Sequence, residues 1–304
     1  MGSVLRNTSR TRRILPLAVL GALFGAAPTA IAEPIVALTT ANSLLQFDSL
    51  TPGTTTSVAV SGTGAEQLVG IDFRPATGQL YGLGSASNLY IINAATGSAS
   101  LVGMLGTPLG GTAFGTDFNP VVDRFRVTSD ADQNLRINPA SPGGAGTIAD
   151  TPLAYAAGDV NVGTNPTVVG SAYTNNVAGA TSTMLFGIDA GLNALVLQSP
   201  ANSGALTTRG PLGFNVPNTL GFDISGRSGI AYAAWAMGNG NGASNLYTVN
   251  LDTGSAALVG RIGTAGGDQV LGLAVAPVPE PALMALFGLG LLTAVRRRRA
   301  AARA

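Results

Sequence analysis

The sequence predicts an all-β protein, a β-propeller of five four-stranded blades closed by a blade that the two ends of the chain share. Three observations lead to this prediction. A unit of about 50 residues recurs along the chain, each complete copy holds four short runs separated by turn residues, and the last copy is cut short. We expect a signal peptide over residues 1–32, the propeller over 33–277 and a sorting signal over 278–304.

The N-terminus has the three parts of a secretory signal peptide. A basic segment is followed by an apolar run, Ile14 to Ala27, which predicts a helix. Ala30 and Ala32 then form an A-x-A cleavage site, so the mature chain is predicted to begin at Glu33. The basic segment contains Arg6, Arg10, Arg12 and Arg13.

Composition excludes several classes of function. Residues 33–280 keep seven of the 16 arginines and all 15 acidic residues, a net charge of −8. Such a domain is a poor partner for nucleic acid, whose binding depends on neutralising phosphates. The chain has no cysteine and no histidine, so it lacks disulfides, thiol chemistry and the commonest general base. The 42 glycines suit short strands joined by tight turns.

The repeat is clearest in two copies, Leu68 to Gly103 and Phe222 to Gly260, with two looser copies between them. One glycine recurs in the first strand of every copy, at spacings of 45, 55, 51 and 51 residues. Four short alternating runs per unit indicate a propeller blade rather than a helical solenoid. The recurring glycines are Gly70, Gly115, Gly170, Gly221 and Gly272.

The fifth copy contains only its first strand, Gly272 to Val275. Three runs near the N-terminus supply the missing strands: Ile35 to Leu38, Leu44 to Asp48 and Thr56 to Val60. We therefore expect a blade shared by both ends of the chain. Closing the ring in this way protects sheet edges that would otherwise invite aggregation.

One segment of the first looser copy resembles a known family. The stretch from Asp117 to Val127, with Gln133 to Pro139, is similar to the hallmark segment of the bacterial family called domain of unknown function 4394. The resemblance covers most of residues 35–277 and implies an exported, β-propeller-like domain. It implies no established activity, so no catalytic residues are carried over.

Three aspartates occupy one equivalent position of the repeat: Asp72, Asp117 and Asp223. If the first strand of each blade lines the axis, the three carboxylates converge there and could bind a cation or sugar hydroxyls. The alternative is that each aspartate accepts backbone N–H groups from the turn just after its own strand.

A second group of oxygen ligands lies in one short segment. Asp130, Asp132 and Asn134 alternate as at the opening of a Ca²⁺-binding loop. The rest of such a loop is missing, since Leu135 stands where glycine is needed and Ser141 where glutamate belongs. The alternative is a hairpin tip with Asx turns. We expect no cofactor, with calcium as the open possibility.

Residue types suited to catalysis are scarce. Glu66 is the only glutamate inside the predicted domain, because Glu33 and Glu280 lie at its margins. A glycosidase needs two carboxyl groups, which here would both have to be aspartates. No G-x-S-x-G elbow is present, and a serine triad needs histidine. We expect a protein that is not an enzyme.

The C-terminus resembles the PEP-CTERM sorting signal of Gram-negative bacteria. Its Pro-Glu-Pro box is Pro279, Glu280 and Pro281, and a 14-residue apolar run, Ala282 to Val295, follows. The run is short for a membrane span of about 20 residues, and the basic cluster after it favours the cytoplasmic side. That cluster is Arg296, Arg297, Arg298 and Arg299. The resemblance implies a transient inner-membrane anchor and processing by an exosortase-type protease.

Together these features predict an exported, non-catalytic binding or structural propeller at the cell surface or in the extracellular matrix. Extracellular polysaccharide is the expected partner class. The alternative is a polysaccharide-active enzyme that uses aspartate carboxylates in the axial cleft.

Overall fold

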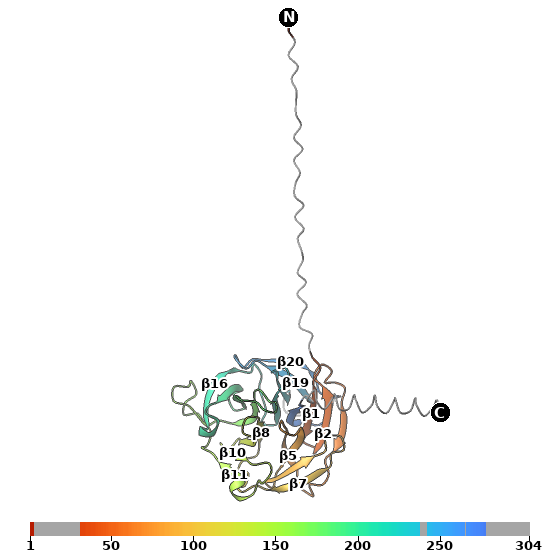
Figure 1. Cartoon of the computed structure of the whole chain (residues 1–304), viewed down its shortest axis with the longest axis vertical. Helices are drawn as coiled ribbons and strands as arrows, with labels where there is room; N and C mark the ends of the chain where they lie inside the picture. The colour runs from red at the N-terminus through yellow and green to blue at the C-terminus, as the bar shows by residue number, and fades with distance from the viewer. Residues whose placement is uncertain (3–30, 238–241, 265, 278–304) are drawn as a thin grey trace, which may run out of the picture. The chain divides into compact units, whose positions relative to one another are not determined.

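The computed structural model describes residues 1–2, 31–237, 242–264 and 266–277. Within residues 31–277 it contains 21 strands in five sheets arranged around a common axis, and all strand pairs but one are antiparallel (Figure 1). The predicted five-bladed propeller is therefore confirmed. Ala30, the sorting motif and both expected terminal helices lie outside the described residues. Among the residues that are described, no helix has the length and apolar character needed to cross a membrane.

Four of the sheets are formed by consecutive segments, which we call blades 2 to 5. Blade 2 contains β4 (Leu68–Arg74), β5 (Gln79–Gly84), β6 (Asn88–Ile92) and β7 (Ala99–Met104). Blade 3 contains β8 (Phe114–Asn119), β9 (Arg124–Ser129), β10 (Asn134–Ile137) and β11 (Thr147–Ala149). Blade 4 contains β13 (Val168–Tyr173), β14 (Leu185–Asp189), β15 (Ala194–Gln198) and β16 (Ala205–Pro211). Blade 5 contains β17 (Leu220–Ile224), β18 (Ala231–Ala236), β19 (Ser244–Val249) and β20 (Ala256–Arg261).

Blade 1 is shared by the two ends of the domain, as the incomplete fifth copy predicted. Its innermost strand is β21 (Val270–Val275), which pairs antiparallel with β1 (Pro34–Thr39). Strands β2 (Ser43–Asp48) and β3 (Thr56–Ala59) complete the sheet. Backbone hydrogen bonds between β1 and β21 thus close the ring. Blade 4 differs from the expected four strands, because the short β12 (Ala154–Tyr155) adds a fifth, parallel to β16.

The innermost strands pack directly on one another around the axis, in the order β4, β8, β13, β17 and β21. The recurring glycine makes this close approach possible. A Cβ atom on Gly115 would lie 2.6 Å from the backbone carbon of Gly170, and one on Gly221 would lie 2.6 Å from the Leu273 nitrogen. Because real Cβ atoms do not come so close to backbone atoms, any side chain here would push two inner strands apart.

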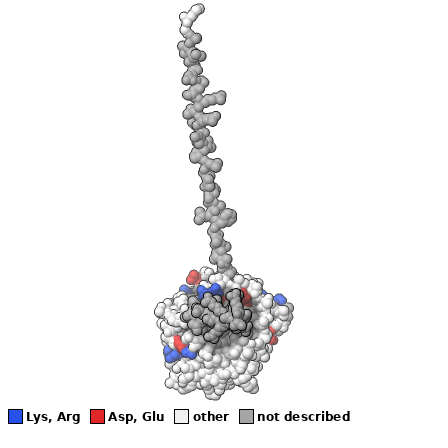
Figure 2. All heavy atoms as spheres, turned by 45° about the vertical axis from the view of Figure 1, so that its right-hand side comes forward, with Lys and Arg blue, Asp and Glu red and all other residues white. Residues whose placement is uncertain are grey.

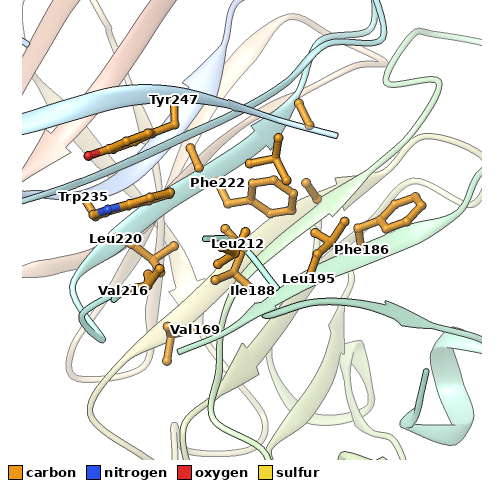
Figure 3. Close-up of a cluster of buried hydrophobic side chains, with 14 of the residues drawn as sticks. Val169, Phe186, Ile188, Leu195, Leu212, Val216, Leu220, Phe222, Trp235 and Tyr247 are labelled. Carbon is orange, nitrogen blue, oxygen red and sulfur yellow. The ribbon is translucent and has the colours of Figure 1, made fainter. Parts of the chain in front are cut away.

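Hydrophobic side chains fill the spaces between adjacent blades. The cluster between blades 4 and 5 is drawn in Figure 3, where Phe222 and Leu220 face Ile188 and Val169. In this cluster Trp235 stacks on Tyr247, with ring centroids 3.9 Å apart and planes 6° from parallel. Both rings are buried, so they contribute to the core and are not exposed for stacking on a ligand. Few charged side chains are visible on the face of the domain that Figure 2 shows.

Candidate functional site

The three aspartates at the equivalent repeat position come together at the axis. Asp72 is in β4, Asp117 in β8 and Asp223 in β17, and one carboxylate oxygen from each lies within 4.8 Å of the others. All three side chains are buried, with Asp117 fully inaccessible. Among the described residues, this is the one cluster of three acidic groups close enough to hold a metal ion. The predicted convergence therefore has a structural basis.

Each of these aspartates links its blade to the next one. Oδ2 of Asp72 accepts the N–H of Phe118 at 2.7 Å, and Oδ2 of Asp117 accepts the N–H of Tyr173 at 2.8 Å. In the same way Oδ2 of Asp223 accepts the N–H of Val275 at 2.6 Å. The donors lie on the neighbouring inner strand and not in the turn after the same strand, which was the alternative raised by the sequence. Asp223 alone also accepts a local N–H, from Ile224.

Burial makes the charged form of this cluster costly. Desolvation and the charge of Asp223 raise the pKa of Asp72, and desolvation with the charges of both other aspartates raises that of Asp117. Burial also raises the pKa of Asp223 to about 7. Oδ1 of Asp72 and Oδ1 of Asp117 have no hydrogen-bond donor among the described residues. A proton shared by Asp72 and Asp117, or a bound cation, would satisfy these oxygens.

The axial carboxylates do not face an open cleft. A cavity of about 10 Å³, no larger than a water molecule needs, lies between the inner strands beside four of the recurring glycines. A polysaccharide chain cannot reach buried carboxylates through such a space. The structure therefore gives no support to an enzyme that acts through these three aspartates.

The predicted calcium-loop residues lie at the hairpin between β9 and β10 but do not converge. Asp130 accepts N–H groups from Thr112 and Ala113, and these bonds lower its pKa although burial opposes the change. Oδ1 of Asn134 instead accepts a hydrogen bond from Arg126 at 2.7 Å. Burial and the charge of Asp189 raise the pKa of Asp132, which sits at the tip with a φ of 60°. The segment is a hairpin tip in which Asp130 and Asn134 bind different partners, and Oδ1 of Asp132 has no hydrogen-bond donor among the described residues.

A different polar site, which we call the arginine pocket, lies between blades 3 and 4. Its volume is about 320 Å³. Blade 3 contributes Asn119 at the end of β8, Arg124 and Arg126 from β9, and Arg136 from β10. Blade 4 contributes Tyr173 at the end of β13, and the connection from β15 to β16 contributes residues 200–202.

Arg126 forms the floor of the arginine pocket and is 1% exposed. Its Nε donates to the Tyr173 hydroxyl at 3.2 Å and its Nη2 to Asn202 Oδ1 at 2.7 Å, so it joins blade 3 to blade 4. Its Nη1 donates to Asp150 at 2.7 Å. Arg136 binds the same carboxylate through two hydrogen bonds, at 2.6 and 2.8 Å, which raise the pKa of the guanidinium. The Asp150 carboxylate thus forms salt bridges with two arginines.

Sequence analysis did not identify this pocket, although a signal was present. Three of the seven arginines in residues 33–280 occur within Arg124 to Arg136, in a domain of net charge −8. They alternate along β9 and recur at the facing position of β10, where Arg126 is directly paired with Arg136. Adjacent arginines on one sheet face repel each other unless an anion lies between them. The segment is also the one that carries the family resemblance.

Glu33, the predicted first residue of the mature chain, is buried although Ala32 before it is exposed. Its carboxylate accepts hydrogen bonds from Ser225, from Ser228 at 3.0 Å and from Tyr232 at 2.9 Å, all on blade 5. Burial and this carboxylate raise the pKa of Tyr232 to about 12. The residue just before β1 therefore fastens blade 1 to blade 5.

Comparison with solved structures returns proteins of low sequence identity. A nidogen/laminin complex is 11% identical with a TM-score of 0.45, covering 82% of this chain and 86% of that one. A protein of unknown function from Bacteroides thetaiotaomicron is 11% identical with a TM-score of 0.47, covering 74% and 55%. The WD40 domain of Toxoplasma gondii coronin is 10% identical with a TM-score of 0.37, covering 76% and 58%. No curated protein matches the chain significantly.

Two family matches cover the domain and the C-terminus. Residues 277–299 match the PEP-CTERM protein-sorting motif, which implies an exported protein processed by an exosortase-type system. Residues 43–274, including the whole of blades 2 to 5, match a family described as a domain of unknown function. The chain therefore belongs to the DUF4394 family, and its propeller is followed by a PEP-CTERM sorting motif.

Proposed function

We propose that this protein is a non-catalytic binding or structural propeller of the cell surface or extracellular matrix. A signal peptide directs its export, the C-terminal segment anchors it transiently in the inner membrane, and an exosortase-type protease then removes that segment. The propeller acts outside the cell by holding extracellular polysaccharide. No step of this role requires a cofactor.

The observation that carries the proposal is the combination of a sorting motif with a rigid ring that has a polar pocket at a blade interface. The motif directs the chain out of the cell. In the described part of the chain, the carboxyl groups with the most strongly raised pKa values are Asp72, Asp117 and Asp223, which are buried at the axis where a substrate does not reach them. The arginine pocket offers guanidinium, amide and hydroxyl donors, which suit binding rather than acid–base chemistry.

The position of Glu33 supports the proposed cleavage of the signal peptide. Its backbone N–H donates to the Ser49 hydroxyl at 3.1 Å, and its carboxylate is enclosed by blade 5. A chain cut before Glu33 retains every one of these contacts, because none involves residues 31 or 32. The domain is thus complete in the form that the proposed processing would produce.

Mass determination of the protein from its native host tests the processing. We expect a chain that begins at Glu33 and lacks Arg296 to Arg299. A mature protein that retains this arginine cluster would overturn the sorting proposal.

Binding of purified protein to extracellular polymer from the same host tests the role. We expect the polymer to bind and to keep its chain length during prolonged incubation. Shortened polymer would show that the protein is an enzyme, and polymer that does not bind would refute the binding role.

A further inference from the structure

We infer that the arginine pocket binds the carboxylate group of an acidic sugar unit in extracellular polysaccharide. This inference rests on the proposed function and names the chemistry of its ligand. It is carried by the charge of the pocket, by donors that the described residues leave free, and by the way other arginines of this chain bind carboxylates.

The arginine pocket is positive in a negative domain. Three positive charges line the pocket, from Arg124, Arg126 and Arg136. Asp150 neutralises one of them, because it forms salt bridges with Arg126 and Arg136. The acid beside Arg124 in sequence, Asp123, is already bound by Arg74 of blade 2. The local balance is therefore +2, although residues 33–280 carry −8. An anionic ligand would offset this local positive charge.

Arg124 lines the pocket and has hydrogen-bond donors that the described residues leave unused. Its Nη1 donates to the backbone carbonyls of Val122 and Asp123, at 3.4 and 2.9 Å, which fixes the guanidinium at the pocket wall. Among the described residues, its Nε and Nη2 have no acceptor. These two groups form one edge of the guanidinium, and their parallel N–H bonds match the two oxygens of a carboxylate.

The other paired arginines show how this edge is used. Arg74 binds Asp123 through Nε and Nη2, and Arg136 binds Asp150 through the same two atoms. Arg124 also lines the pocket, and among the described residues the equivalent edge of its guanidinium binds no carboxylate. The geometry therefore favours a planar carboxylate at this place.

The rest of the lining suits the hydroxyl groups of a sugar ring. Asn119 accepts two backbone N–H groups through Oδ1, and its amide nitrogen has no acceptor among the described residues. Asn202, which also lines the pocket, uses Oδ1 for Arg126, and its amide nitrogen has no acceptor among the described residues. The volume of about 320 Å³ lies at the small end of the range for ligand pockets, which is enough for a sugar unit but not for a long segment of polymer.

Calorimetric titration of the purified exported protein with oligogalacturonate tests the inference. The matched neutral probe is the methyl-esterified oligomer, which has the same sugar ring without the carboxylate charge. We expect the acidic oligomer to bind, and esterification to weaken binding about tenfold or more, the effect of losing a charge-assisted pair of hydrogen bonds. Failure of the acidic oligomer to bind, or equal binding of both oligomers, would overturn the inference.

Arg124→Gln is the diagnostic variant, because the side chain of Arg124 donates hydrogen bonds only to backbone carbonyls among the described residues, and the salt bridges of Arg126 and Arg136 do not involve it. It should weaken oligogalacturonate binding about tenfold or more while the melting temperature stays unchanged. Arg261→Gln is the matched control, since it removes an equal charge from the exposed end of β20 on blade 5. Similar losses in both variants would show that only the overall charge matters, which would also refute the pocket.

Inorganic sulfate and phosphate distinguish the carboxylate from other anions. Neither should compete with the oligomer at equal concentration, and strong competition by either would overturn the assignment to an acidic sugar. Binding to host polymer separates this inference from the proposed function. If Arg124→Gln binds the host polymer as well as the wild type does, the arginine pocket is not the binding site, but the proposed role in holding polysaccharide stands. If the wild type does not bind the polymer, the pocket inference and the proposed function are both refuted.

Discussion

Replacing Asp117 by asparagine tests the electrostatics of the axial cluster. Asp117 is fully buried, its Oδ2 holds the Tyr173 N–H, and its Oδ1 has no donor among the described residues. An asparagine side chain keeps the hydrogen bond to Tyr173 through its oxygen. Its amide group is then directed at Asp72, with which Asp117 shares a hydrogen bond in the protonated state. The variant therefore imitates a protonated Asp117 at every pH.

The expected gain follows from the cost of the unpaired carboxylate. A buried acceptor without a donor costs about 1–3 kcal/mol, and the amide supplies a donor while it removes one of three close negative charges. We expect Asp117→Asn to stabilise the domain by about 2 kcal/mol at pH 8. For a domain of this size that corresponds to a rise of about 4–8 °C in Tm. At pH 5 the gain should nearly vanish, because a proton already provides the same hydrogen bond in the wild type.

Thermal unfolding followed by circular dichroism, at pH 5 and pH 8 with EDTA present, measures both values. Asp252→Asn is the control for net charge, since Asp252 is exposed and distant in sequence from the cluster. A gain of equal size at both pH values, or no gain at pH 8, would refute the reasoning. Adding Ca²⁺ in place of EDTA tests whether the axial carboxylates bind a cation. If they do, Ca²⁺ should raise the Tm of the wild type but not that of Asp117→Asn.

Three further predictions concern the same ring. Because burial raises the pKa of Asp223 from 3.8 to about 7, this carboxyl should stabilise the fold below about pH 4, and that stability, on the order of 4 kcal/mol, should be lost as the pH rises through 7. Urea unfolding of the wild type and of Asp223→Asn at several pH values measures the difference. An increase in wild-type stability relative to the variant as the pH rises would contradict the prediction. Glu33→Ala should cost about 2–4 kcal/mol by leaving the Tyr232 hydroxyl and two serine hydroxyls of blade 5 unpaired, and a loss below about 0.5 kcal/mol in urea unfolding would exclude a role in fastening the blades. Gly221→Ala should destabilise the domain by about 1–3 kcal/mol, because the new Cβ would lie 2.6 Å from a backbone atom. Gly53→Ala is the control and should leave stability unchanged, because its Cβ would have no neighbour nearer than 3.9 Å. Equal melting temperatures for the two variants would argue against the close approach of the inner strands.

The repeat showed that the axial aspartates occupy equivalent positions, but it did not show which groups they bind. Their equivalent positions left two alternatives open, convergence of Asp72, Asp117 and Asp223 at the axis or bonding of each to the turn after its own strand, and the structure brings the three carboxylates together. Their hydrogen-bond partners were not predictable. The donors stand 46, 56 and 52 residues further along the chain, and the distance between adjacent inner strands decides whether a carboxylate reaches them.

The arginine pocket shows the same limit more strongly. Its arginines are close in sequence, but Arg126 becomes part of a pocket only when Asn202, 76 residues away, faces it across a blade interface. The hairpin tip near Asp132 illustrates a related limit of the sequence pattern. Alternating oxygen ligands in a sequence are equally compatible with side chains that face inward to one ion and with side chains held by separate neighbours.

The sequence alone determined the sorting motif, the number of blades and the joining of both chain ends in one blade. These features are linear patterns, because a signal is read along the chain and a blade is built from consecutive hairpins. The tertiary structure alone decided that the aspartates brace neighbouring blades, that the axis is closed and that a positive pocket opens between blades 3 and 4. Such properties depend on how one blade packs against the next, and the period of a repeat contains no information about that packing.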